Sequence, residues 1–313
     1  MFIMSYNIPI LLIVYNRVDK TRQLLNIIEK IKPKKLFISA DGPKQKNEDI
    51  KNCKEVRKIF DNINFKCDLN KKFNETNKGL KINVKESINW FFSNIDKGII
   101  LEDDCLPSES FFIFCENLLN KYYDNENIMH INGTNLGINY EDNLKESYFF
   151  SKLNHVWGWA TWKRAWIHYE DNFNNYLDYK NTGKILKYFV DKKITKWMIN
   201  YYDKSFKGID NIWSTNWSFS ILKNNGLCIS PKLNLVKNIG FDGSGTSSKS
   251  DLFRKFSEVN VDHFEEILHP ETLIYNVDYD KLAFNEKISK IDPRANFFNK
   301  LKLYFKRKFS SLV

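Results

Sequence analysis

Short, continuous apolar runs separated by helical patterns limit most strongly how this chain can fold. Residues 10–14 read Ile-Leu-Leu-Ile-Val and residues 99–101 read Ile-Ile-Leu, without the alternation of a half-exposed strand. Such runs are typical of strands covered on both faces, as in parallel sheets. Between them, residues 24–31 and 80–91 repeat apolar side chains at intervals of three and four, the period of an amphipathic helix. The first half therefore predicts repeated βα units, which build a parallel sheet with right-handed crossovers.

The size and composition suit one large domain or two closely joined ones. The chain has 313 residues, of which 42% are hydrophobic and 15% aromatic, enough to bury a core. Further strands are expected at 36–39 and 65–69. The regular pattern ends near residue 125, and the following stretch is rich in tryptophan and tyrosine. We expect a nucleotide-sugar-binding half at 1–125, an acceptor-binding and catalytic half of the same domain at 126–290, and a basic tail at 291–313.

The tail carries much of the positive charge. The net charge is +10, and residues 293–313 contain six lysines and arginines and no acid, which leaves +4 for the rest. Phe297, Leu301, Phe305 and Phe309 recur at four-residue spacing, so 296–313 predicts a basic amphipathic helix. Such a helix can lie on an anionic membrane surface, or it can pack on the body with its lysines in water. No nucleic-acid partner is expected, because no RNA-binding aromatic motif or DNA-reading helix is visible.

Cysteines and hydropathy bear on the compartment. The five cysteines form no CxxC pair, which predicts neither a disulfide framework nor a zinc site and suits a reducing cytoplasm. The apolar run at 8–15 is shorter than the roughly 20 residues of a spanning helix, and it lacks the basic leader of a signal peptide. The expected location is cytoplasmic, with peripheral attachment at the inner face of the cell membrane through the tail.

Polar residues follow three of the expected strands. They are Tyr15, Asn16 and Arg17 after the first strand, Asp41 after the second, and Glu102, Asp103 and Asp104 after the fourth. In open parallel sheets, ligands bind beyond the carboxyl ends of the strands. These residues therefore predict one shared pocket.

The triple acid is the strongest chemical signal. Three adjacent carboxylates repel one another, which raises the cost of ionising them all. A divalent cation relieves that repulsion, and hard oxygen ligands suit Mg²⁺ or Mn²⁺, with a diphosphate able to supply further oxygens. The alternative reading of Glu102-Asp103-Asp104 is a solvated acidic turn.

The segment 98–107, Gly-Ile-Ile-Leu-Glu-Asp-Asp-Cys-Leu-Pro, resembles the DxD-type metal motif of GT-A glycosyltransferases. It is most similar to the EDD variant of N-acetylglucosaminyltransferase I and of related bacterial nucleotide-diphospho-sugar transferases. Other segments resemble that family in the same order, over roughly residues 8–250: 13–17, 40–42, 77–81 and 157–162. The resemblance implies an α/β GT-A fold, a Rossmann-like three-layer sandwich with a mostly parallel central sheet, to which the C-terminal amphipathic helix is added.

The resemblance also implies roles for the strand-end residues. Asp104 would ligate the Mn²⁺ or Mg²⁺ ion that bridges the diphosphate. Asp103 would contact the ribose or the donor sugar, with support from Glu102, and Asp41 would accept a hydrogen bond from uracil. The remaining donor-binding residues would lie near the nucleotide or its phosphates: Tyr15, Asn16, Arg17 and Lys81. For Arg17 the alternative is a surface salt bridge, and for Lys81 a solvated helix lysine.

The acceptor side and the catalytic base depend on the second half. Trp157 and Trp159 could form a stacking platform for a sugar ring, or they could pack in the core. An inverting transferase needs a carboxylate base, but the stretch that matches the family's acidic segment, 213–217, contains no acid. Asp210 is the nearest candidate, with Asp242 and His155 as alternatives. Residues 240–249 are a Gly/Ser loop that suits a lid over the donor or an ordinary surface loop.

These features together predict a metal-dependent glycosyltransferase. By resemblance it would be inverting and would move a hexosyl or N-acetylhexosaminyl group from a UDP-sugar to a glycan or lipid-linked acceptor in cell-surface polysaccharide or lipopolysaccharide synthesis. One alternative is a nucleotidyltransferase, although such enzymes usually carry a Gly-rich loop where residues 15–17 have no glycine. Another is a catalytically impaired sugar-nucleotide-binding protein. The donor sugar, acceptor, linkage and oligomeric state stay open at this stage.

Overall fold

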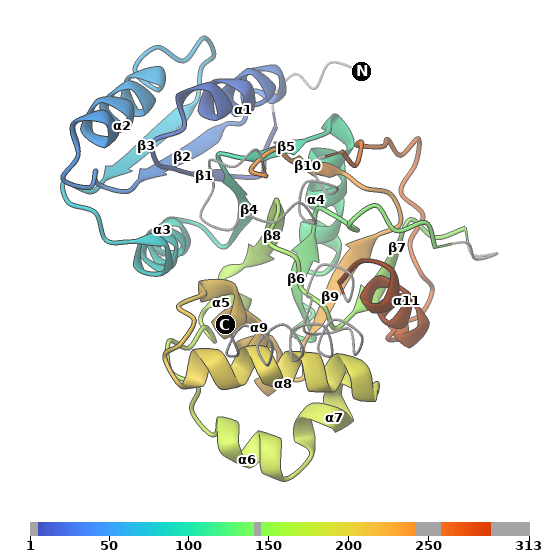
Figure 1. Ribbon diagram of the computed structural model, residues 1–313. Helices are drawn as coiled ribbons and strands as arrows, with labels where there is room; N and C mark the ends of the chain where they lie inside the picture. The colour runs from blue at the N-terminus through green and yellow to red at the C-terminus, as the bar shows by residue number, and fades with distance from the viewer. Residues whose placement is uncertain (1–5, 141–144, 242–257, 289–313) are drawn as a thin grey trace, which may run out of the picture.

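A computed structural model describes residues 6–140, 145–241 and 258–288 (Figure 1). Their main feature is an eight-stranded sheet with the order β3-β2-β1-β4-β8-β6-β9-β7, beside a two-stranded sheet of β5 and β10. The strands are β1 Ile10–Val14, β2 Lys35–Ala40, β3 Asp68–Phe73, β4 Lys97–Glu102, β5 Cys105–Pro107, β6 Ile128–Asn132, β7 Tyr148–Ser151, β8 Trp159–Trp162, β9 Leu227–Pro231 and β10 Val236–Asn238.

Helices connect and cover these strands (Figure 1). They are α1 Val18–Ile31, α2 Asn47–Ile59, α3 Leu80–Asn94, α4 Glu109–Lys121, α5 Lys163–Trp166, α6 Tyr176–Asn181, α7 Lys184–Phe189, α8 Lys192–Phe206, α9 Trp213–Lys223 and α11 Val277–Ala283, followed by the π-helical turn η1 Phe284–Ile288. No helix among the described residues combines the length and the apolar character needed to cross a bilayer.

The predicted α/β class with a mostly parallel sheet is confirmed. β1 to β4 are mutually parallel, and so are β6 and β9, whereas β8 runs antiparallel to both β4 and β6, and β7 runs antiparallel to β9. The predicted division at residue 125 falls between α4 and β6, and the two sides of it share one continuous sheet through β8.

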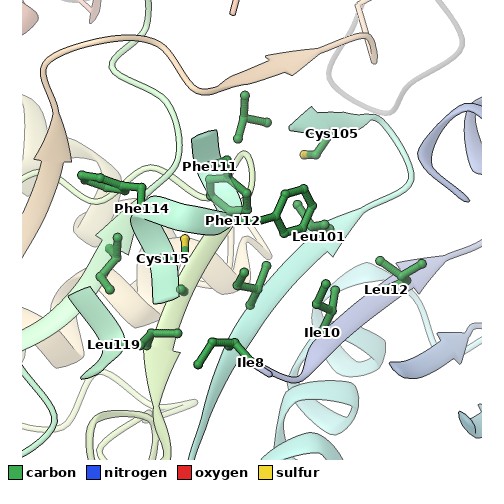
Figure 2. Close-up of a cluster of buried hydrophobic side chains, with 14 of the residues drawn as sticks. Ile8, Ile10, Leu12, Leu101, Cys105, Phe111, Phe112, Phe114, Cys115 and Leu119 are labelled. Carbon is green, nitrogen blue, oxygen red and sulfur yellow. The ribbon is translucent and has the colours of Figure 1, made fainter. Parts of the chain in front are cut away.

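Alternate residues of β1 explain why helices cover both faces of the sheet. Ile10 and Leu12 belong to a core shared with α1, α2 and α4. Leu11 and Ile13 belong to a second core shared with α3, α5 and α9. Figure 2 shows the first of these cores, where labelled side chains of β1, β4 and α4 meet beneath Cys105. Packing on both faces fixes β1 and β4 side by side, so their carboxyl ends are held together.

The third strand differs from the sequence prediction. We expected it at 65–69, but β3 spans Asp68–Phe73. Among the described strands, β3 stands at the edge of the sheet and pairs with β2 alone, and none of its residues is fully buried. An edge strand of this kind needs no apolar run, and the apolar residues at 65–69 lie mainly in the approach to it. The predicted tail helix at 296–313 and most of the predicted lid at 240–249 lie outside the described residues.

A helical lobe extends from the second half of the chain, at the opposite end of the molecule from α1 and α2 (Figure 1). We define this lobe as residues 176–210, which comprise α6, α7, α8 and the turn after α8. Its inner faces form a third core with α9 and α11, in which Tyr176, Ile185 and Tyr202 are buried.

Candidate functional site

The candidate site lies where β1, β2, β3 and β4 end. These strands are parallel neighbours, and their register places Val14 opposite Ala40 and Ile13 opposite Glu102. The polar residues that follow each strand therefore emerge at one edge of the sheet, as the sequence predicted for the residues after β1, β2 and β4.

Arg17 directly contacts the acidic segment at the end of β4. Its Nη1 donates to Asp103 Oδ1 at 2.9 Å and to Asp104 Oδ2 at 2.7 Å. Burial alone would lower the pKa of Arg17, but the charges of Asp103 and Asp104 outweigh burial and raise it. One guanidinium therefore balances part of the charge of three consecutive carboxyl groups.

The remaining negative charge is unfavourable in this environment. Burial, followed by the charges of Asp104 and Asp103, raises the pKa of Glu102 to about 8. Burial raises the pKa of Asp103 to about 6, even though Arg17 acts in the opposite direction. Both shifts favour an additional proton or cation at this edge.

The donor set fits a hard divalent cation. All three side chains offer oxygen ligands, and among the described residues the Cys105 Sγ, at 3.6 Å, is the one hydrogen-bond partner of Asp104 Oδ1. Within the described ranges, no three His, Cys, Asp or Glu side chains are gathered closely enough to hold a metal ion between them. An ion at Asp104 would therefore need oxygens from a second source, such as a diphosphate.

The chain around β10 lies against the acidic segment. β10 pairs with β5 so that Asn238 lies opposite Cys105, and the Ile239 N–H donates to the Asp104 carbonyl at 2.8 Å. A Cβ atom on Gly240 would lie 2.2 Å from Asp104 Oδ2, so only glycine fits there without a shift. Phe241 then meets Trp157 edge-on, with ring centroids 5.2 Å apart. Trp157 is thus linked to the acidic segment through residues 240–241.

The Asp41 carboxylate forms its hydrogen bonds with the protein itself. Its two carboxylate oxygens accept five hydrogen bonds at 2.9–3.3 Å, from the backbone of Gly42, Lys78 and Gly79 and from the side chains of Asn74 and Asn77. Asp41 as a whole is 4% exposed. It therefore fixes the turn between β3 and α3, and the uracil contact implied by the family resemblance would have to compete with these donors.

Tyr15 and Asn16 bind an acid that the sequence analysis did not identify. The Tyr15 hydroxyl donates to Asp49 Oδ2 at 2.5 Å and Asn16 Nδ2 donates to Asp49 Oδ1 at 2.6 Å, while the Lys44 N–H also donates to Asp49. Burial would raise the pKa of Asp49, but these hydrogen bonds outweigh it and lower the pKa. Asp49 lies in the first turn of α2, where acids are common, so the available sequence signal pointed to helix capping and not to the site.

Lys81 and Asp210 are not joined to this cluster by any contact among the described residues. Lys81 is half-buried in the first turn of α3, and its side chain forms no hydrogen bond or ion pair with a described residue. Asp210 lies between α8 and α9 and pairs with Lys204, with Nζ and Oδ2 3.6 Å apart.

The predicted role of Trp159 in acceptor binding is corrected by its position in the core. It is only 1% exposed, and its ring stacks on His130 at 4.8 Å and on Trp213 at 5.8 Å between ring centroids. The ring is stacked within the core and almost fully buried, so no face is accessible to the predicted sugar. Trp157, which is half-buried, keeps that possibility.

His155, one alternative base, lies in the loop between β7 and β8. Its backbone N–H donates to Asn132 Oδ1 at 2.6 Å, and its carbonyl accepts from His130 Nε2 at 3.0 Å. Its own Nε2 is buried and has no hydrogen-bond partner among the residues that the structure describes. Burial lowers the pKa of His155 to about 4, so the imidazole is neutral near pH 7. The other alternative, Asp242, lies outside the described residues.

Fold and site together define an α/β protein with an acidic, arginine-bridged site at the carboxyl edge of a mostly parallel sheet. No protein-family model matches the chain, and no curated protein matches its sequence. Among solved structures, the chain is similar to the mannosyltransferase PcManGT from Pyrobaculum calidifontis in complex with GDP-Man and Mn²⁺. The identity is 12% and the TM-score 0.31, over 50% of this chain and 45% of that one. The chain thus spans less than half of that protein, and the similarity carries no argument about function.

Proposed function

We propose that this chain is a metal-dependent glycosyltransferase that transfers a hexosyl or N-acetylhexosaminyl group from a nucleotide-diphospho-sugar, with UDP as the nucleotide. One observation carries the proposal: three consecutive carboxyl groups stand at the carboxyl edge of the sheet, and among the described residues Arg17 alone forms ion pairs with them, to Asp103 and Asp104, while the pKa of Glu102 is raised to about 8. The negative charge of these carboxylates is only partly balanced by Arg17. A divalent cation would balance more of it, and a diphosphate bound to that cation would supply the cation's remaining oxygen ligands.

The chemistry assigns a task to each group. The leaving group is a nucleoside diphosphate, which gains negative charge as the glycosidic bond breaks. Asp104 would hold Mn²⁺ or Mg²⁺ through its Oδ1 atom, whose one hydrogen-bond partner among the described residues is the Cys105 thiol, and a bound ion of this kind stabilises the charge of the leaving diphosphate. Arg17 would add a second positive charge, and Asp103, supported by Glu102, would accept hydrogen bonds from a ribose or sugar hydroxyl.

The acceptor would approach from the side of Trp157. This half-buried indole contacts Phe241, and the adjacent Gly240 presses on Asp104, so an acceptor sugar on Trp157 would lie close to the donor end of the site. An inverting reaction needs a base. Asp210 stays the first candidate, and His155 is the alternative, with a buried ring nitrogen that has no hydrogen-bond partner in the described part of the chain.

The proposal extends to location and pathway. A glycan or lipid-linked acceptor suits cell-surface polysaccharide or lipopolysaccharide synthesis at the inner face of the cell membrane. Residues 296–313 would supply the peripheral attachment to anionic lipid.

A donor-hydrolysis and transfer assay tests the proposed reaction. Purified protein is incubated with a panel of UDP- and GDP-sugars, with Mn²⁺ or with EDTA, and release of the nucleoside diphosphate is measured. We expect release from one donor with Mn²⁺ only, and its loss in Asp104→Ala. Asp61→Ala is the matched control, because Asp61 is an exposed acid paired with Lys71 on the surface. Metal-independent release, or full activity of Asp104→Ala, would refute the proposal. Tight donor binding without release or transfer would instead indicate an impaired binding protein.

A further inference from the structure

The helical lobe exposes an unusual number of apolar side chains. Five of the fifteen large apolar side chains that are exposed among the described residues lie within 176–210, a larger share than random scatter over the surface would place there. They are Leu177 at 50% exposure, Leu186 at 38%, Val190 at 58%, Phe206 at 45% and Ile209 at 66%.

These side chains come from α6, α7 and the end of α8, and those of α7 lie away from the core of the lobe. In α7, Ile185, Tyr188 and Phe189 are buried at the spacing of one helix face, so Leu186 and the adjoining Val190 lie away from that core. α6 buries Tyr176, next to the exposed Leu177. The Tyr176 and Phe206 rings lie 5.4 Å apart, which brings the end of α8 beside the start of α6. The exposed apolar groups therefore come from three elements that pack against one another.

The lobe that carries these exposed apolar side chains is also positively charged. Residues 176–210 contain eight lysines and four aspartates, with no arginine or glutamate. All four aspartates are engaged within the lobe: Asp178 with Lys184, Asp203 with Lys180, Asp210 with Lys204, and Asp191 as the N-cap of α8. The other five lysines are exposed and form no ion pair with a described residue: Lys187, Lys192, Lys193, Lys196 and Lys207.

We propose that the helical lobe docks on an anionic lipid bilayer. The exposed aliphatic and phenylalanine side chains would enter the headgroup region, and the five free lysines would lie among the lipid phosphates. A second copy of the chain fits less well, because a twofold interface would set the same lysines against each other. Nucleic acid fits less well too, since the lobe contains no arginine and its exposed apolar groups are mainly aliphatic. This docking surface lies in the described part of the chain and does not depend on the reaction at Asp104.

Vesicle co-sedimentation of the full chain tests the surface. The probes are phosphatidylcholine vesicles with and without phosphatidylglycerol, at low and high salt. One variant removes apolar contact, Leu186→Ser with Val190→Ser, and the other removes charge, Lys187→Gln with Lys193→Gln and Lys196→Gln. All five positions are exposed, so the fold should tolerate both, which circular dichroism and the melting temperature check.

Matched controls come from other helices. Ile82→Ser with Ile113→Ser removes two apolar side chains of similar exposure, and Lys46→Gln with Lys51→Gln and Lys54→Gln removes three exposed lysines around α2. We expect salt-sensitive binding to the anionic vesicles, reduced at least threefold by each lobe variant and by neither control. Binding that is equal on neutral vesicles, undetectable on anionic ones, or unchanged by the lobe variants would overturn the proposal. Binding that is unchanged by the lobe variants is the result expected if residues 296–313 alone bind the membrane.

Discussion

The ends of β2 and β4 look alike in sequence but differ in how the protein treats their acids. Asp41 follows β2 and accepts five hydrogen bonds from the surrounding chain. Asp103 and Asp104 follow β4 and share one guanidinium, that of Arg17, while Glu102 has a strongly raised pKa. A carboxylate whose donors are all internal stabilises the fold, whereas carboxylates left short of partners at the same edge are suited to a ligand.

The largest expected effect tests the β4 end. Asp104→Asn keeps the shape of the side chain but removes the charge that would hold a divalent ion. We expect donor hydrolysis and sugar transfer to fall by about 100-fold or more, as when a key electrostatic group is removed from an active site. The free energy of unfolding should change little, because one member of a repelling group is neutralised. Steady-state kinetics with Mn²⁺ and urea denaturation measure the two quantities. If Asp104→Asn kept its activity, the acids at the end of β4 would not be catalytic or ligand-binding groups, and the contrast with Asp41 would fail.

The next effect tests the β2 end. In Asp41→Asn an amide group replaces one oxygen and faces N–H donors in a buried site. We expect the free energy of unfolding to fall by about 2–4 kcal/mol, because hydrogen bonds to a charged group are lost and donors are left unpaired. Urea denaturation measures it, with Asp104→Asn as the matched control. If Asp41→Asn kept its stability but no longer bound the nucleotide sugar, Asp41 would be a ligand-binding residue. The contrast between the two strand ends would then fail.

A third buried carboxylate, away from this edge, gives a smaller and pH-dependent effect. Asp280 of α11 accepts hydrogen bonds from Ser151 Oγ at 2.5 Å and the Lys152 N–H at 2.9 Å, but burial raises its pKa from 3.8 to about 6. Because the folded state favours the protonated form, its contribution to stability is present below about pH 4 and is lost as the pH rises through about 6.

Asp280→Asn should therefore flatten the dependence of the unfolding free energy on pH. We expect the fall between about pH 4 and 7 to be smaller than in the wild type by about 1–3 kcal/mol, since one pKa unit corresponds to about 1.4 kcal/mol. Denaturant titrations at several pH values measure it, with Asp278→Asn as an exposed control on the same helix. Parallel pH profiles for the wild type and Asp280→Asn would contradict the assignment.

The smallest expected effect concerns Arg17, whose guanidinium is the positive charge that the protein itself places beside these acids. Arg17 occupies one oxygen of each of Asp103 and Asp104, so it should oppose binding of a second cation in the absence of nucleotide. We expect Arg17→Gln to tighten Mn²⁺ binding about three- to tenfold, roughly 1 kcal/mol, by electron paramagnetic resonance titration. Arg22→Gln, an exposed arginine of α1, is the control for a general change of charge. Weaker or unchanged Mn²⁺ binding in Arg17→Gln would show that Arg17 and the ion do not compete.

Sequence reasoning reached the parts of the site that depend on local pattern. The apolar runs of β1 and β4 predicted that Arg17 and the acids would emerge at one edge, and these groups are in contact. It missed Asp49, because the binding of Tyr15 to an acid 34 positions away depends on how α2 packs and leaves no periodic signal.

Burial was harder to predict than secondary structure. Trp157 and Trp159 are two residues apart, and the sequence gives both the same options of sugar stacking or core packing. Only the tertiary fold separates them, since Trp159 enters β8 and is covered by His130 and Trp213, while Trp157 stays half-buried beside Phe241. The shifted third strand has a similar cause, because the polar sequence of β3 becomes a strand only through its pairing with β2.

The most direct test of the central claim is a thermal-shift titration with nucleotide sugars. Wild type and Asp104→Asn are each melted with a panel of donors, with Mn²⁺ and with EDTA, because a ligand that binds only the folded state raises the melting temperature. The account predicts that one donor stabilises the wild type with Mn²⁺ and not with EDTA, and that Asp104→Asn loses this response. It is contradicted if no donor shifts the wild type, or if the shift persists without metal or without the Asp104 carboxylate.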